Sequence, residues 1–144
     1  MSEIVIDASV IVSILFKDEE SHYSKSILEF MMQGNVIIVP EIFHAEILNV
    51  IVVSERRGRI NNNDIHQMLR FLSGLEIVTI SYTNKEEILY LARKYNLTSY
   101  DATYLGLAIN KKTQIATLDK RLKEVSVAEE IYWGNKNISD NLSK

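Results

Sequence analysis

Short runs of β-branched and aliphatic residues alternate in this chain with longer segments whose apolar residues recur at helical spacing. The short runs are typical of buried strands, and the longer segments are typical of helices that pack against a sheet. Five runs fit the strand pattern, at residues 3–6, 36–39, 76–80, 114–117 and 130–133. Because helical segments separate successive strands, the sequence predicts a three-layer α/β/α fold with a twisted parallel sheet and right-handed crossovers.

Residues that start or stop secondary structure stand between these segments. Ser21 is a candidate N-cap, and Pro40 ends the second strand and can open the next helix at its first position. That helix spans about residues 41–57, with Gly58 as its stop. Residues 83–86 have the form of a capping box, in which the first and fourth residues satisfy each other's backbone N–H groups. Local signals therefore agree with the boundaries that the hydrophobic pattern predicts.

Length and composition favour one domain. With 144 residues, 47% hydrophobic and 24% charged, the chain can bury a core and is ordinary for a globular protein. We expect a single domain over 1–133 and a polar C-terminal tail over 134–144 that frays. The absence of cysteine excludes disulfides and thiolate chemistry. The sequence shows no basic leader and no apolar run of membrane-spanning length, so we expect a cytoplasmic protein with no membrane partner.

Three acidic residues stand where a parallel sheet presents its ligand-binding edge. Asp7 directly follows the first strand, and Asp119 comes two residues after Thr117, the end of the fourth strand. Asp101 lies in the first turn of a helix that leads into this fourth strand. Ligands bind beyond the carboxyl ends of parallel strands, and a helix packed antiparallel to the strands begins near the same edge. We therefore expect these three carboxylates to lie near one another.

A fourth acid, Glu46, lies among apolar neighbours inside the helix at 41–57. A carboxylate on an apolar face is costly unless it is paired or bound to a metal, although a glutamate at the margin can extend into water. The other acids also have local explanations. Asp7 and Asp119 can cap the helices that follow them, and Asp101 is favoured by its helix dipole. The coincidence of four such acids favours one shared site.

Converging carboxylates repel one another and raise one another's pKa unless a cation lies between them. A hard divalent ion removes this cost, and Mg²⁺ or Mn²⁺ prefers oxygen ligands and keeps water molecules for a substrate. Such an ion can activate water and neutralise charge on a phosphodiester. The residues themselves therefore indicate metal-assisted phosphodiester hydrolysis in a small α/β domain.

Four strings of the sequence resemble motifs of the PIN-domain nucleases, and more closely those of the small VapC-type toxins of toxin–antitoxin pairs. The strings are IDAS at 6–9, HAEILN at 44–49, YDATY at 100–104 and TLDKRL at 117–122. Each string is short, but their order and spacing extend the resemblance over nearly the whole chain. The resemblance implies a five-stranded sheet in the order 3-2-1-4-5, which puts the first and fourth strands side by side at its centre.

The same resemblance implies a site, a cofactor and partners. The acids that match the family's catalytic metal ligands are Asp7, Glu46, Asp101 and Asp119. Ser9 and Thr117 match hydroxyl positions that support the site by hydrogen bonding. The implied function is a Mg²⁺-dependent endoribonuclease, with Mn²⁺ able to substitute, that acts as the toxin of a type II pair. The implied partners are RNA, a cognate antitoxin that occludes the pocket, and a second copy in a homodimer.

Two other functions are compatible with a small domain of this kind. A non-catalytic PIN-like subunit would bind RNA or take part in an assembly, although the presence of all four acids argues against it. A receiver-like phosphoacceptor domain would carry an acid at the end of its third strand, where this chain has residues Thr79-Ile80-Ser81. We therefore expect the ribonuclease and keep both alternatives for comparison with the structure.

Basic and aromatic residues are less specific. The net charge of −3 argues against general affinity for nucleic acid. The densest basic cluster, at 55–59, can contact RNA phosphates, but a helix C-terminus also favours such residues through its dipole. Lys120 and Arg121 are further candidates for phosphate contact, being adjacent to the acid of the fourth strand. We expect Tyr104 and Trp133 to pack in the core or at an interface.

Overall fold

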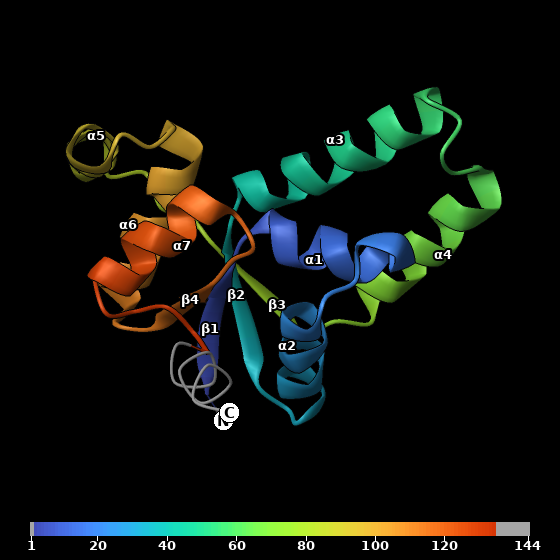
Figure 1. The fold of residues 1–144 in the computed structure, drawn as a ribbon, viewed down its shortest axis with the longest axis horizontal. Helices are drawn as coiled ribbons and strands as arrows, with labels where there is room; N and C mark the ends of the chain where they lie inside the picture. The colour runs from blue at the N-terminus through green and yellow to red at the C-terminus, as the bar shows by residue number, and fades with distance from the viewer. Residues whose placement is uncertain (1, 135–144) are drawn as a thin grey trace.

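The computed structural model describes residues 2–134, in which a parallel sheet lies between two groups of helices (Figure 1). The strands are β1 (Glu3–Ile6), β2 (Val36–Pro40), β3 (Ile77–Ile80) and β4 (Gln114–Ala116). The helices are α1 (Ala8–Leu15), α2 (His22–Met32), α3 (Ile42–Arg56), α4 (Asn62–Ser73), α5 (Lys85–Tyr95), α6 (Ser99–Lys111) and α7 (Lys120–Ala128). A short 3-10 helix, η1 (Lys17–Glu19), follows α1. The predicted α/β fold is confirmed. None of the helices in these residues is long and apolar enough to span a bilayer.

The strands lie in the order β3-β2-β1-β4, and each neighbouring pair is parallel. In the centre, Val5 of β1 pairs with Ile38 of β2 on one side and with Ile115 of β4 on the other, and all three are buried. Strands covered on both faces consist of unbroken apolar runs, as these do. The chain reaches β3 at one edge and then returns to β4 on the far side of β1. The topological switch point, where ligands bind in such sheets, therefore lies between β1 and β4.

The predicted fifth strand is wrong in extent. Residues 130–133 form a single parallel bridge, between Tyr132 and Ile115 of β4, instead of a strand. Two backbone hydrogen bonds support it, from the Ile115 N–H to the Ile131 carbonyl at 2.8 Å and from the Trp133 N–H to the Ile115 carbonyl at 2.9 Å. The backbone has a positive φ just before the bridge, at Glu130, and just after it, at Gly134. Both turn the chain, so the segment is too short to extend the ladder. The predicted tail at 134–144 lies outside the described residues except for Gly134.

The predicted boundaries hold at most helices and fail at two. Ser21 caps α2 as predicted, in a reciprocal arrangement with Ser24. The capping box predicted for 83–86 is wrong, because Asn84 caps α5 by accepting from the Glu87 N–H at 3.1 Å. Asparagine is among the strongest N-caps, which explains the shift by one residue. Pro40 ends β2 as predicted but does not open α3, which begins two residues later.

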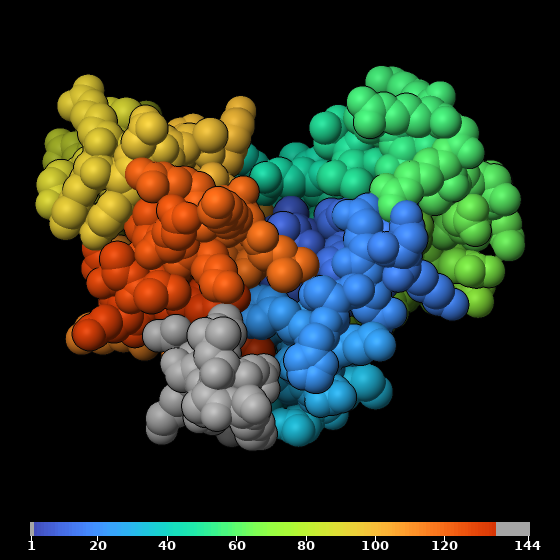
Figure 2. Space-filling model, in the orientation of Figure 1, coloured from blue at the N-terminus to red at the C-terminus, as the bar shows by residue number. Residues whose placement is uncertain are grey.

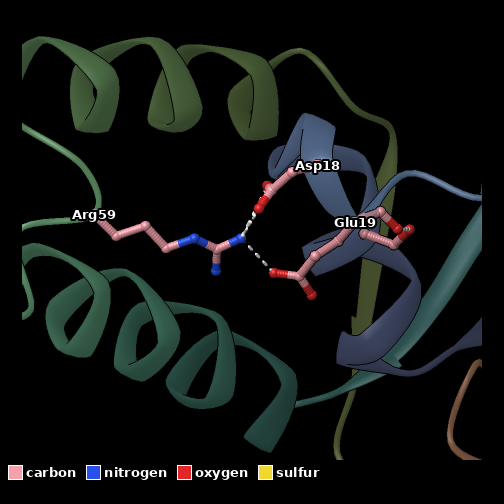
Figure 3. Close-up of polar contacts among 4 residues, drawn as sticks. Asp18, Glu19 and Arg59 are labelled. Carbon is pink, nitrogen blue, oxygen red and sulfur yellow. Dashed lines mark hydrogen bonds and ion pairs between the residues drawn. The ribbon is translucent and has the colours of Figure 1, made fainter.

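Helices α3 and α4 form an arm that extends away from the sheet, shown in green at the right of Figure 1. Its tip is fastened to the end of α1 by Arg59, whose guanidinium lies 4.2 Å above the Phe16 ring. The same guanidinium lies 2.9 Å from Asp18 Oδ1 and 2.8 Å from Glu19 Oε2 (Figure 3). Exposed ion pairs contribute little singly, but here one cation joins two acids and an aromatic face. The arm carries Glu46 on α3, so this contact helps to fix where Glu46 lies.

Gly106 lets α6 approach the segment that follows β3. A Cβ atom at this position would lie 2.7 Å from the Tyr82 ring, closer than side chains tolerate. The Tyr82 hydroxyl also accepts a hydrogen bond from the Asn110 amide, one turn further along α6, at 3.2 Å. Most residues of α6 from Ala102 to Ala108 are buried. This close approach seats the helix whose first turn carries Asp101.

Candidate functional site

Asp7 is the most buried of the predicted acids, with 5% of its surface exposed. It follows β1 directly, and its own N–H donates to the Ala116 carbonyl of β4 at 3.2 Å, which continues the pairing of the two strands. Its side chain caps α1 by accepting from the Ser9 N–H at 3.1 Å. The predicted local role as an N-cap is therefore confirmed. It does not compete with a role in a site, because the carboxylate keeps further lone pairs.

Two hydroxyl groups hold the Asp7 carboxylate. Ser9 Oγ donates to Asp7 Oδ1 at 2.5 Å, and Thr117 Oγ1 donates to Asp7 Oδ2 at 2.7 Å. Burial raises the pKa of Asp7 to about 7, while the hydrogen bonds from Ser9 and Thr117 act in the opposite direction. Charges on Asp101 and Asp119 raise this pKa further. Both hydroxyl-bearing residues thus contact an acid of the site.

The same two hydroxyls join the β1–α1 junction to the β4–α7 junction. Thr117 Oγ1 accepts from the Asp119 N–H at 3.0 Å, and Ser9 Oγ accepts from the Leu118 N–H at 2.9 Å. Asp119 itself is exposed and caps α7 by accepting from the Leu122 N–H at 2.9 Å. Thr117 therefore fixes the backbone of one acid and the carboxylate of another.

Asp101 is partly buried in the first turn of α6, as predicted. Thr98 caps this helix, and its Oγ1 accepts from the Asp101 N–H at 3.1 Å. Burial raises the pKa of the Asp101 carboxyl, and the negative charges of Asp119 and Glu46 raise it further. Since Asp101 is also among the charges that act on Asp7, it lies within electrostatic range of all three other acids.

Glu46 has a partner that sequence analysis missed. The Tyr104 hydroxyl of α6 donates to Glu46 Oε1 of α3 at 2.6 Å, and only 1% of the Tyr104 surface is exposed. Burial and the hydrogen bond to Glu46 raise the pKa of Tyr104 above its ordinary value, so it remains a donor. Tyr104 was expected to pack in the core, which it does, but it also orients an acid. The available signal was its spacing of three residues from Asp101, which places both on one face of α6.

None of the four acids has a basic partner within residues 2–134. The ion pairs there join Arg59 to Asp18 and Glu19, and Arg121 to Glu124. In the same residues, no three Asp, Glu or His side chains converge closely enough to form a metal-binding group by themselves. The site is thus a set of neighbouring carboxylates at the switch point of the sheet. Figure 2 shows this side of the molecule as a notch between α3, in green, and the yellow and orange helices.

Comparison with known proteins places this fold and its motifs in one family. The PIN domain family model matches residues 4–128. The chain belongs to the PIN domain family. This membership, together with the strand order 3-2-1-4, excludes the receiver-like alternative, whose fold has the order 2-1-3-4-5.

Among proteins similar to this PIN domain is Ribonuclease VapC3 of Pyrobaculum aerophilum, 26% identical over 126 residues. The match covers 85% of this chain and 93% of that protein. The crystal structure of PAE2754, also from Pyrobaculum aerophilum, has a TM-score of 0.64 and 22% identity, over 84% of each chain. A toxin–antitoxin complex from Klebsiella pneumoniae contains a chain with a TM-score of 0.54 and 18% identity, over 81% of this chain and 86% of that one.

Three of the other candidate residues of the PIN domain, Arg59, Arg121 and Trp133, have structural partners. Arg59 fastens the arm, and Arg121 donates to the Tyr95 carbonyl and pairs with Glu124. Trp133 packs edge-on against Tyr23 and Phe30, as expected for a core aromatic. These residues are therefore engaged in the fold, and Lys120 remains exposed beside Asp119.

Proposed function

We propose that this PIN domain is a metal-dependent endoribonuclease and the toxin component of a type II toxin–antitoxin pair. The observation that carries the proposal is the set of carboxylates Asp7, Glu46, Asp101 and Asp119 at the switch point of the sheet. Negative charges within this set raise the pKa of Asp7 and of Asp101, and none of the four acids has a basic partner within residues 2–134. The name Ribonuclease VapC3 of a relative with matching length supports RNA as the substrate.

The donor set fits a hard divalent cation. All four side chains offer oxygen, which Mg²⁺ and Mn²⁺ prefer, and a divalent charge would offset the mutual repulsion of the acids. Because the carboxylates of residues 2–134 do not form a closed group of ligands, we expect water to supply part of the coordination, as is usual for Mg²⁺. When bound, the ion would neutralise phosphate charge and favour ionisation of the attacking water.

Each residue then has a distinct task in the hydrolysis of a phosphodiester bond. Ser9 and Thr117 hold both oxygens of Asp7, so its carboxylate presents a fixed geometry. Tyr104 holds one oxygen of Glu46 and leaves the other free to orient the nucleophilic water for in-line attack. Asp101 and Asp119, on the first turn of α6 and at the N-cap of α7, complete the acidic edge.

The decisive experiment incubates the purified wild-type protein with RNA in Mg²⁺ and in EDTA. The Asp101→Asn variant is incubated with the same RNA in Mg²⁺. We expect cleavage by the wild type in Mg²⁺ only, and none by the variant. Glu86→Gln is the matched control, because it also turns a carboxylate into an amide in the first turn of a helix, on an exposed acid of α5 outside the site. Cleavage by Asp101→Asn at the wild-type rate would refute the site, and absence of cleavage by the wild type would favour the non-catalytic alternative.

The partners follow from the same proposal. The toxin–antitoxin complex from Klebsiella pneumoniae supports a cognate antitoxin for this chain. We propose that this antitoxin covers the acidic notch. We also propose a homodimer, a cytoplasmic location and a single functional domain over 1–133. Co-expression with the product of a neighbouring reading frame, followed by size-exclusion chromatography with light scattering, tests both kinds of assembly.

A further inference from the structure

A hollow of about 420 Å³ adjoins the acidic site between α1 and α3. Ser9 and Glu46 connect the hollow to the acidic site, because both line the hollow. Ser9 also donates to Asp7, and Glu46 is itself one of the four acids and is held by Tyr104. Its volume lies in the range of small-molecule binding sites, about 300–1,000 Å³. A nucleotide whose phosphate lay at the acids would therefore place a neighbouring group within reach of this hollow.

The walls of the hollow suit the face of a heterocyclic ring. Ala8 and Val12 of α1 lie on one side and Val50 of α3 on the other, and Leu118 contributes a partly exposed apolar side chain. Aliphatic walls of this kind offer dispersion contacts and exclude water without demanding hydrogen bonds from the ring face. The hollow thus combines these four apolar side chains with polar ones, which are Ser9, Ser13, Glu19, Glu46 and Asn49.

Asn49 supplies a polar group at the right place on the wall. It follows Glu46 by three residues on α3, so both side chains lie on the same face of the helix. It lines the hollow and is exposed, so its amide is available to a ligand. A side-chain amide presents a donor and an acceptor together, and it pairs bidentately with the adjacent donor and acceptor of adenine.

The charge of the hollow is milder than that of the acidic site. Its one further acid among the described residues, Glu19, lies 2.8 Å from the Arg59 guanidinium, which offsets part of its negative charge (Figure 3). A neutral base therefore meets less repulsion here than a phosphate would. The Arg59 contact has a second consequence, because it fixes the arm that forms one wall.

We propose that this hollow is a base-binding subsite in which Asn49 reads an adenine next to the cleaved phosphodiester. The proposal rests on the proposed ribonuclease function for the position of the phosphate. The preference for a base is a separate property, because it depends on Asn49 and the apolar walls and not on the acids. Single-stranded RNA suits such a site, because its unstacked bases can leave the strand.

The first test maps cleavage sites in an RNA library of random sequence for the wild type, Asn49→Ala and Asn63→Ala. Asn63 is an exposed asparagine of α4 and serves as the matched control. We expect adenine to be enriched at one position beside the cut by the wild type and by Asn63→Ala. Loss of the bidentate contact in Asn49→Ala should reduce this enrichment about tenfold. An unchanged base profile in Asn49→Ala, or a wild type without base preference, would overturn the proposal.

A second measurement does not depend on cleavage. Short oligonucleotides centred on adenine or on uracil are added to the Asp101→Asn variant, and the side-chain amide signal of Asn49 is followed by NMR. We expect the adenine series to shift this signal and to bind about tenfold more tightly than the uracil series. If the signal responds but the wild type cuts no RNA, the ribonuclease proposal fails and the subsite stands. If RNA is cut and the signal does not respond, the subsite fails and the ribonuclease stands.

Discussion

The two strand-to-helix junctions at the centre of the sheet are built alike and differ in environment. Each places an aspartate after a strand, and each aspartate caps the next helix, Asp7 for α1 and Asp119 for α7. Asp7 is buried and held by two hydroxyls, whereas Asp119 is exposed and accepts from a backbone N–H. The comparison teaches that capping depends on local sequence, while burial depends on where the strand lies. β1 has a neighbouring strand on each side, whereas β4 pairs with β1 on one side and forms only a single bridge, to Tyr132, on the other.

The largest expected effect is on catalysis, and it separates the two junctions. Asp7→Asn should lower the Mg²⁺-dependent rate of RNA cleavage by roughly 10³-fold, because charge stabilisation through a metal ligand is worth several kcal/mol. Asp119→Asn should cost less, because water can take the place of an exposed ligand. Single-turnover rates at saturating Mg²⁺ measure both. Equal losses for the two variants would mean that burial does not matter to the function of these acids.

The next effect is on stability in the absence of metal. The pKa of Asp7 rises from its ordinary value of 3.8 to about 7 in the fold, so the folded state binds its proton more tightly than the unfolded chain. Between about pH 4 and pH 7 the unfolded chain loses that proton first, and the free energy of unfolding falls as pH rises. One group contributes up to about 4 kcal/mol over this window. The raised pKa of Asp101 acts in the same direction.

Denaturant unfolding in EDTA from pH 4 to pH 8 measures this slope. Asp7→Asn removes the titrating group, so it should flatten the pH dependence and should be more stable than the wild type above pH 7. Asp119→Asn serves as the comparison and should reduce the slope only in part, because it removes one of the charges that raise the pKa of Asp7 and of Asp101 but leaves both groups in place. A wild-type protein whose stability rises from pH 4 to pH 7 would contradict the assignment of a destabilising buried charge to Asp7.

The smallest effect should come from the residue that joins the two junctions. Thr117→Val keeps the shape of the side chain but removes the hydroxyl that donates to Asp7 and accepts from the Asp119 N–H. Loss of a partner that orients a metal ligand typically costs about 10- to 100-fold in metal affinity or activity. Mn²⁺ titration by calorimetry and cleavage rates would report both. Thr113→Val is the control, because Thr113 precedes β4, at the end of the strand opposite Thr117, and its hydroxyl donates to the Glu3 carbonyl of β1. Unchanged Mn²⁺ affinity in Thr117→Val would remove Thr117 from the site.

The sequence pattern predicted the strands and helices well because their apolar spacing is a local property. It also identified Asp7, Asp101 and Asp119 as residues of one sheet edge, because a parallel sheet brings its carboxyl ends together. It failed at residues 130–133, where positive φ values on both sides leave room for one bridge. It could not identify Tyr104 as the partner of Glu46, because that contact joins two helices that are distant in the sequence.

The sequence alone therefore determined the order in which strands, helices and acids follow one another along the chain. It also determined the N-cap role of each junction aspartate. These follow from residue types and spacing within a few positions of the chain. The tertiary structure decided which carboxylate is buried, which hydroxyls hold it, and which acids act on one another. The reason is that burial, hydrogen bonding across β1 and β4, and the repulsion between charges all depend on distances between segments far apart in the chain.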